Sequence, residues 1–322
     1  MRVLGIETSC DETAASVVGP EGVLSDVIHT QEIHRIYGGV VPELAGRAHA
    51  ERVVSTVRAA LERAGVQRPD AVAATSGPGL VGAVLVGLCF GRAAAAGWGV
   101  PFIGVNHLEG HLLSPLLENP APSFPFMALV VSGGHTTLYR AEALGRYEVL
   151  GQTVDDAAGE AYDKVARLLH LGYPGGPGVD ALAATGDPGA VPFPRPSPGG
   201  LNWSFSGLKT AVRAHMERPG RAPDADVAAS FQEAVADVLC DRVVRAARAT
   251  GLRQITLSGG VAANSRLRAR ISALDLDVFL PPRARCTDNG AMIAHAGRLH
   301  LLAGHASPRP ITARPQWTPG TP

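Results

Sequence analysis

Two patterns occur twice in this sequence in the same order, and this repetition restricts the fold more than any other feature. Runs rich in β-branched residues predict a hairpin over residues 3–18 and a second hairpin over residues 126–139. A strand, a glycine turn and a helix are predicted from residue 71, with the helix starting at Leu80, and again from residue 254, with the helix starting at Val261. With 322 residues the chain is long enough for about two domains. The sequence therefore predicts an internally duplicated α/β protein.

A duplicated sheet with crossover helices resembles the two-lobed architecture of actin, sugar kinases and the Hsp70 ATPase. We expect a first lobe over residues 1–122 and a second over residues 123–289, with a segment of about 290–322 that could pack back on the first. Apolar residues at helical spacing predict core helices over Glu43–Ala64 and Val227–Thr250. In folds of this kind ligands lie where the glycine turns of both lobes converge, so the two hairpin turns are expected to serve as phosphate loops.

The pentad His107-Leu108-Glu109-Gly110-His111 carries the strongest chemical signal. A four-residue gap places both imidazoles on one face of a helix, where they can share a metal. A zinc protease with two histidines at this gap needs its glutamate directly after the first histidine, as general base. Here that position is Leu108, and Glu109 lies about 200° around the helix from His107. The pattern therefore favours a metal site and disfavours a protease, although an incidental pair of histidines stays open at this point.

Composition limits the partners and the compartment. Basic and acidic residues number 29 each, so the whole-molecule field offers a nucleic acid no strong attraction. Any RNA contact would come from local patches, such as Arg266, Arg268 and Arg270, although an ordinary solvated face is the more common reading. Four widely spaced cysteines form no CxxC pair, which suits a reducing compartment. We expect a cytoplasmic protein without a membrane anchor.

Several motifs in order resemble one family over nearly all of residues 1–300. They are Gly5-Ile6-Glu7-Thr8-Ser9-Cys10-Asp11-Glu12-Thr13, the histidine pentad, Val131-Ser132-Gly133-Gly134-His135-Thr136, Asp155-Asp156-Ala157-Ala158-Gly159-Glu160-Ala161-Tyr162-Asp163-Lys164, Tyr173-Pro174-Gly175-Gly176-Pro177, Ser204-Phe205-Ser206-Gly207-Leu208-Lys209-Thr210, Ser258-Gly259-Gly260-Val261-Ala262-Ala263-Asn264 and Thr287-Asp288-Asn289-Gly290-Ala291-Met292. This set resembles the tRNA adenosine threonylcarbamoyltransferases, formerly filed as glycoproteases. That family moves a threonylcarbamoyl group from threonylcarbamoyl-AMP to N6 of the adenosine next to the anticodon, in tRNAs that read codons beginning with A.

The resemblance assigns roles to individual residues. It makes His107, His111 and Asp288 the metal ligands, a set compatible with Fe(2+), which we favour, or Zn(2+). For the donor and the substrate it implies contacts at Val131, Ser132, Gly133, Gly134, His135, Asp163, Gly176, Asp180 and Asn264. Structural alternatives remain for these positions: the glycines as turn formers, Asn264 as a helix cap and Asp163 as a surface acid.

Acyl transfer needs an activated electrophile, because the amine of adenine is a poor nucleophile. We hypothesise that the metal polarises the carbamoyl oxygen while the turn from Ser132 to His135 donates backbone N–H groups to the donor. Asp11 and Glu12, in the hairpin turn of the first lobe, are weaker candidates for accepting the amine proton.

Two other readings compete with the transferase. A sugar kinase or ATPase of the same fold would explain the glycine turns but leaves the histidine pair without a role. A non-enzymatic scaffold paralogue would be expected to lack the metal ligands. The family also implies partners besides tRNA and threonylcarbamoyl-AMP: an inactive paralogue that forms a heterodimer with this chain, and a small P-loop ATPase.

Overall fold

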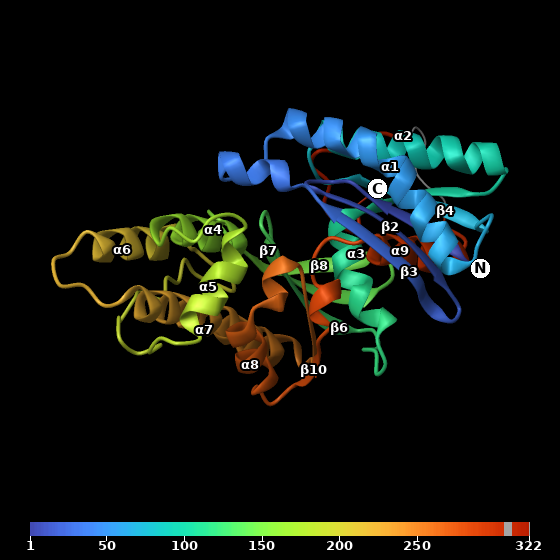
Figure 1. Cartoon of the computed structure of the whole chain (residues 1–322). Coiled ribbons are helices and arrows are strands. Elements are labelled where there is room, and N and C mark those ends of the chain that lie inside the picture. The colour runs from blue at the N-terminus through green and yellow to red at the C-terminus, as the bar shows by residue number, and fades with distance from the viewer. Residues whose placement is uncertain (306–310, 322) are drawn as a thin grey trace. The chain divides into compact units, whose positions relative to one another are not determined.

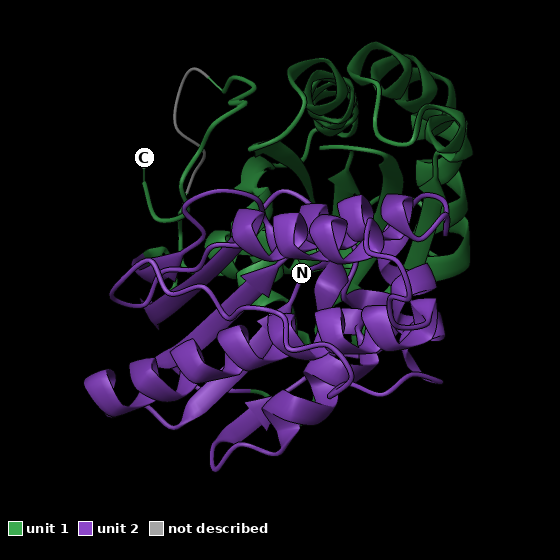
Figure 2. Cartoon of the chain, turned by 90° about the vertical axis from the view of Figure 1, so that its left-hand side faces the viewer, with its two compact units in different colours: residues 1–121, 144–146, 288–322 green, residues 122–143, 147–287 purple. Residues whose placement is uncertain are grey.

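The computed structural model describes residues 1–305 and 311–321, which form two compact units (Figure 2). Unit 1 comprises Met1–Ala121, Leu144–Arg146 and the described residues of Asp288–Pro322, and unit 2 comprises Pro122–Ala143 and Tyr147–Thr287. The expected lobe boundary after residue 289 had placed Asp288 in the second lobe, and therefore a metal between the two lobes. In the structure Asp288 belongs to unit 1, together with His107 and His111.

Unit 1 is built on a mixed sheet whose strand order is β3-β2-β1-β4-β5. The strands β1, β2 and β3 are antiparallel neighbours, whereas β4 and β5 run parallel to β1. Their bounds are β1 Val3–Glu7, β2 Glu12–Gly19, β3 Gly22–Thr30, β4 Ala71–Gly77 and β5 Phe102–Asn106. The helices are η1 Glu32–Tyr37, α1 Pro42–Ala64, α2 Val81–Trp98, α3 His107–Leu113, η2 Ser114–Leu117 and α9 Gly290–Leu302.

Helices cover both faces of this sheet, which is why its central strands are buried throughout (Figure 1). Successive side chains of a strand point to opposite faces, so Leu4 and Ile6 pack under α1 and α2. Gly5 points to the other face, against α9. A Cβ at Gly5 would lie 2.2 Å from the carbonyl oxygen of Gly290, so this glycine allows α9 to rest directly on β1. The segment that carries Asp288 is held in place by this backbone contact.

Unit 2 repeats the same design with the strand order β10-β9-β6-β7-β8. The strands are β6 Phe126–Val131, β7 Thr136–Ala143, β8 Arg146–Gln152, β9 Gln254–Ser258 and β10 Asp277–Phe279. The helices are α4 Ala158–Leu168, α5 Gly175–Ala183, α6 Ser206–Met216, α7 Asp224–Thr250, η3 Gly260–Ala263, α8 Ser265–Ser272 and η4 Arg283–Arg285. An antiparallel β6–β7 hairpin and a parallel β6–β9 pair match β1–β2 and β1–β4. The predicted duplication is confirmed.

One predicted boundary is wrong in detail. The helix expected from Val261 is preceded by the short 3₁₀ turn η3, and α8 begins at Ser265. The reason is local: the side chain of Asn264 accepts a hydrogen bond from the N–H of Leu267 at 2.9 Å, which caps the helix four residues later than expected.

Helix α2 is long and apolar enough to cross a bilayer, by length and composition alone. Core helices of globular proteins pass the same test, so this is weak support for a membrane span. In unit 1 the helix packs against α1 and β4 as part of the α/β layer.

Candidate metal centre

The two histidines lie on α3, which follows directly after the end of β5. The side chain of Asn106 accepts hydrogen bonds from the N–H groups of Leu108 at 2.9 Å and Glu109 at 3.2 Å, so it starts the helix at His107. One helical turn separates His107 from His111, and their ring centroids lie 4.8 Å apart. Both rings are buried, with His111 fully covered. The predicted helical pairing of the two imidazoles is confirmed.

Asp288 completes the group. Its Oδ1 atom lies 2.9 Å from Nε2 of His111 and 3.7 Å from Nε2 of His107. The three ligand atoms lie within 4.8 Å of one another. Metal–ligand bonds of about 2.0–2.2 Å put adjacent ligand atoms roughly 3 Å apart, which the two separations from Asp288 approach. The residues present therefore fit a metal held through both Nε2 atoms and one carboxylate oxygen.

A second carboxylate orients His107 from behind. Oε2 of Glu7, at the end of β1, lies 2.9 Å from Nδ1 of His107 and also accepts a hydrogen bond from Oγ1 of Thr75 at 2.6 Å. The hydroxyl of Ser9 lies 3.1 Å from the same Nδ1. A carboxylate can only accept, so Nδ1 carries the proton and the lone pair of Nε2 points toward the metal position. Glu7 is fully buried, which makes it part of the site.

The charges of His107, Glu7 and Asp288 act on one another and shift the pKa values of His107 and Glu7. Burial disfavours the imidazolium of His107, but the charges of Asp288 and Glu7 outweigh it and raise the pKa of His107 to about 9. For Glu7, burial favours the neutral acid, but the charge of His107 and its hydrogen bond hold the pKa below its ordinary value. A cation bound here would replace the proton in compensating the two carboxylates.

Glu109 points away from the ligands, as expected. Its Oε1 atom accepts a hydrogen bond from Nε2 of His300 on α9 at 2.9 Å. It therefore joins α3 to α9 and is not part of the metal-ligand group. The protease reading loses its general base in the structure as well as in the sequence.

The turn between β1 and β2 lies close to Asp288. Burial, followed by the charges of Asp288 and Asp11, raises the pKa of Glu12 well above its usual value. Asp288 also raises the pKa of Cys10, after burial and the charge of Asp11. The carbonyl of Asp11 accepts a hydrogen bond from the N–H of Gln31 at 3.0 Å, which attaches the turn to the segment that follows β3. The structure thus brings Asp11 and Glu12 near the metal ligands within unit 1.

In unit 2 the turn from Ser132 to His135 follows Val131 at the end of β6. The N–H of Ser132 donates to the carbonyl of His135 at 2.7 Å, and the N–H of His135 donates to Oγ of Ser132 at 3.1 Å. These two N–H groups are used inside the turn, contrary to the expectation that the whole turn donates to a ligand. A Cβ on Gly133 or Gly134 would meet nothing within 4 Å, so both glycines border open space.

The other predicted substrate contacts in unit 2 stabilise helix ends. Asp163 accepts a hydrogen bond from the N–H of Gly175 at 2.7 Å. Asp180 accepts from Oγ of Ser265 at 2.6 Å and from Nδ2 of Asn264 at 3.2 Å. Since the side chain of Asn264 also caps α8, its structural alternative is confirmed. Gly176 lies in the first turn of α5, with open space where a Cβ would be.

The arginines considered for RNA are engaged within unit 2. Arg266 and Arg270 both pair with Glu233 on α7. Arg268 donates to the carbonyl groups of Ala262 at 3.1 Å and Pro281 at 3.0 Å. Arg266 and Arg270 therefore join α8 to α7, and Arg268 joins α8 to the segment after β10.

The sequence analysis assigned the three metal ligands but missed two other contributors to the site. The first is Glu7, for which the only signal was a carboxylate at the end of an otherwise apolar strand. The second is the chain end, residues 311–321, which lies along unit 1. The N–H of Arg314 donates to the carbonyl of Ser76 at 2.7 Å. The carbonyl of Trp317 accepts from Nδ2 of Asn106 at 3.1 Å, so the tail supports the residue that caps α3.

Close relatives share this sequence almost end to end. Two proteins of Anaeromyxobacter dehalogenans, from strains 2CP-C and 2CP-1, are each 53% identical over 98% of this chain and 99% of their own length. Both are described as tRNA N6-adenosine threonylcarbamoyltransferase.

Solved structures confirm the actin-like fold. HypF of T. kodakarensis matches with a TM-score of 0.67 and 18% identity, over 94% of this chain and 48% of that chain. Component A of the (R)-2-hydroxyglutaryl-CoA dehydratase of Acidaminococcus fermentans matches with a TM-score of 0.56 and 15% identity, over 92% of this chain and 96% of that chain. Such distant likeness supports the fold alone. The family model for tRNA N6-adenosine threonylcarbamoyltransferase matches residues 22–295, and with the close relatives it shows that the chain belongs to this family.

Proposed function

We propose that this chain transfers the threonylcarbamoyl group of threonylcarbamoyl-AMP to N6 of the adenosine next to the anticodon, with a metal held by His107, His111 and Asp288. The observation that carries the metal role is the convergence of two Nε2 atoms and one carboxylate oxygen within 4.8 Å. Two histidines and one carboxylate leave coordination positions open, which suits Fe(2+) first and Zn(2+) second. A metal bound there would supply positive charge for the carbonyl or phosphate oxygens of the donor.

The reaction is an acyl transfer at a mixed anhydride. N6 attacks the carbamoyl carbon, the bond from that carbon to the phosphate oxygen of AMP breaks, and the amine proton is lost. Gly133 and Gly134 border open space, so their N–H groups are suited to binding an anionic donor. Asp11 and Glu12 are candidates for the proton acceptor, and a raised pKa makes Glu12 a stronger base than an ordinary carboxylate.

Mass analysis of tRNA nucleosides, after reaction with purified enzyme, partner proteins and donor, tests this function. The wild-type chain should produce N6-threonylcarbamoyladenosine, and His111→Ala should produce none. Glu109→Gln is the matched control, because it changes a buried residue of the same helix that binds His300 instead of the metal. Full activity of His111→Ala would refute the metal role. Sugar phosphate formed from ATP and a sugar would favour the alternative kinase.

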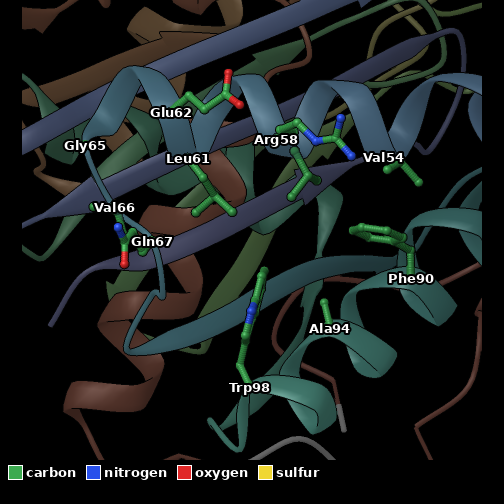
Figure 3. A pocket seen from close by; sticks show the side chains of 11 residues that line it. Val54, Arg58, Leu61, Glu62, Gly65, Val66, Gln67, Phe90, Ala94 and Trp98 are labelled. Atoms are coloured by element: carbon green, nitrogen blue, oxygen red, sulfur yellow. The ribbon is translucent and has the colours of Figure 1, made fainter.

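An inactive paralogue and a small P-loop ATPase complete the proposed system. For the paralogue we assign the open groove between α1 and α2, which has a volume of about 640 Å³ (Figure 3). Leu61 from α1 and Phe90 and Trp98 from α2 line it, with Arg58 and Glu62 at its edge. A largely apolar groove with a charged edge is typical of a protein interface.

Val54 is half exposed at this groove, so Val54→Glu should prevent co-elution with the paralogue. Val149→Glu is the matched control, because it places the same charge on an exposed valine of β8 in unit 2. Co-elution of Val54→Glu with the paralogue would show that the interface lies elsewhere. For the location we propose the cytoplasm, since all four cysteines are free thiols.

A further inference from the structure

The short helix η1 exposes three large apolar side chains within five residues. Ile33 is 46% exposed, Ile36 is 75% exposed and Tyr37 is 58% exposed. No other five-residue stretch among the described residues shows three such side chains. We call Ile33, Ile36 and Tyr37 the η1 surface. Clustered exposed apolar groups on a protein surface typically mark a binding site.

A buried chain of hydrogen bonds holds this surface rigid from below. The N–H of Val41 donates to Nδ1 of His34 at 3.2 Å, so the ring carries its proton on Nε2 and donates to Oε1 of Gln31 at 2.8 Å. Nε2 of Gln31 in turn donates to the carbonyl of Ala45 at 3.3 Å. His34 is fully buried and each donor in the chain meets an acceptor. The outward side chains are therefore presented on a preformed support.

The same support is attached to the turn that carries Asp11 and Glu12. The N–H of Gln31 donates to the carbonyl of Asp11 at 3.0 Å. His49 of α1 makes a second connection, with Nδ1 at 2.8 Å from Oγ1 of Thr13 and Nε2 at 3.0 Å from the carbonyl of Cys10. Since Asp288 acts electrostatically on Cys10 and Glu12, the η1 surface is joined by two short connections to the neighbourhood of the metal ligands.

The composition of the surface favours a nucleobase as its ligand. Tyrosine offers a flat face on which any base can stack, and the isoleucines extend the apolar area. Arg35 adds an exposed cation, and its ion pair with the still more exposed Glu32, at 3.8 Å, is weak in water, so a phosphate can compete for the guanidinium. We propose that the η1 surface stacks against an unpaired base of the tRNA anticodon loop, beside the adenosine to be modified. This inference rests on the proposed function and adds a specific RNA contact to it.

Steady-state kinetics of the full chain with its partner proteins test the stack. Tyr37→Ala should raise KM for tRNA about 10-fold, which is ~1.4 kcal/mol, while KM for threonylcarbamoyl-AMP stays unchanged. Tyr37→Phe keeps the flat ring and should behave as the wild type. Leu302→Ala removes an equally exposed apolar side chain of unit 1 outside the η1 surface and should change neither constant. A tRNA KM for Tyr37→Ala equal to that of the wild type would overturn the proposal.

Photocrosslinking gives a readout that does not depend on activity. An anticodon stem-loop with 5-bromouridine at single loop positions should crosslink to Tyr37 at a position next to the target adenosine, as mapped by mass spectrometry. Absence of such a crosslink with wild-type protein that modifies tRNA normally would refute the stack and leave the proposed function intact. If wild-type protein forms no modified nucleoside, the proposed function itself fails. If Tyr37→Ala instead weakens binding of a partner protein, the η1 surface is a protein interface and the proposal is wrong.

Discussion

Replacing Glu7 by glutamine tests the idea that a buried carboxylate prepares His107 for a metal. In the native protein one oxygen of Glu7 accepts from the N–H of Ser9, and the other accepts from Thr75 and from Nδ1 of His107. An amide has only one oxygen. If that oxygen stays with Ser9, the NH₂ group faces Nδ1, which must then accept, and the proton moves to Nε2 on the metal side.

The opposite orientation of the amide is also unfavourable. Its NH₂ group would face the N–H of Ser9, and two buried donors without an acceptor cost about 1–3 kcal/mol. Either outcome weakens metal binding. Loss of such an outer partner typically lowers metal affinity 10- to 100-fold, which agrees with that free energy. We therefore expect Glu7→Gln to bind metal about 10- to 100-fold more weakly than the wild type.

Competition with a chromophoric chelator for Zn(2+), on purified protein at neutral pH, measures this ratio. Thr75→Val is the matched control, since it removes the other side chain bonded to the same oxygen but leaves the carboxylate for His107. Its metal affinity should fall less than that of Glu7→Gln, because the carboxylate still accepts from Nδ1 of His107 and keeps the tautomer. Wild-type affinity in Glu7→Gln would show that the tautomer of His107 is set by something else.

Three further outcomes are expected. Gly5→Ala places a Cβ 2.2 Å from the carbonyl oxygen of Gly290, so α9 must shift; we expect a loss of about 1–3 kcal/mol in the free energy of unfolding by urea denaturation, and an unchanged value would contradict the close packing. Burial lowers the pKa of His295 to about 4, so the unfolded chain binds a proton that the folded chain does not. Stability should be complete above pH 6.5 and fall by up to about 3 kcal/mol as the pH drops toward 4, and His295→Leu should flatten this slope. A chain ending at residue 316 lacks the carbonyl of Trp317 that binds Asn106, and it should bind Zn(2+) about fivefold more weakly; wild-type affinity would show that the cap on α3 does not depend on the tail.

Local spacing was sufficient to predict the part of the site that lies on one helix. The four-residue gap between His107 and His111 has a single meaning on a helix, and the structure confirms it. The same periodicity predicted that Glu109 points away from the two histidines, and its hydrogen bond to His300 confirms this. The internal duplication could also be inferred, because hairpins and strand–turn–helix segments each occurred twice, and the two five-stranded sheets confirm it.

Contacts between distant segments could not be predicted in this way. Asp288 was assigned from family resemblance alone, and its place in unit 1 depends on the packing of α9 on β1. Glu7 lies in an apolar strand, where an acid carries no periodic signal for a partner 100 residues away. The bond from Asn106 to Trp317 joins residues that no local pattern connects.

The large separation of Asp288 from the histidines has a consequence for biosynthesis. A nascent chain presents both imidazoles long before its third ligand has been translated. Metal capture by all three ligands would therefore have to wait until the segment that carries Asp288 has left the ribosome. A product that ends before Asp288 would keep only the two imidazoles and would compete poorly for the ion.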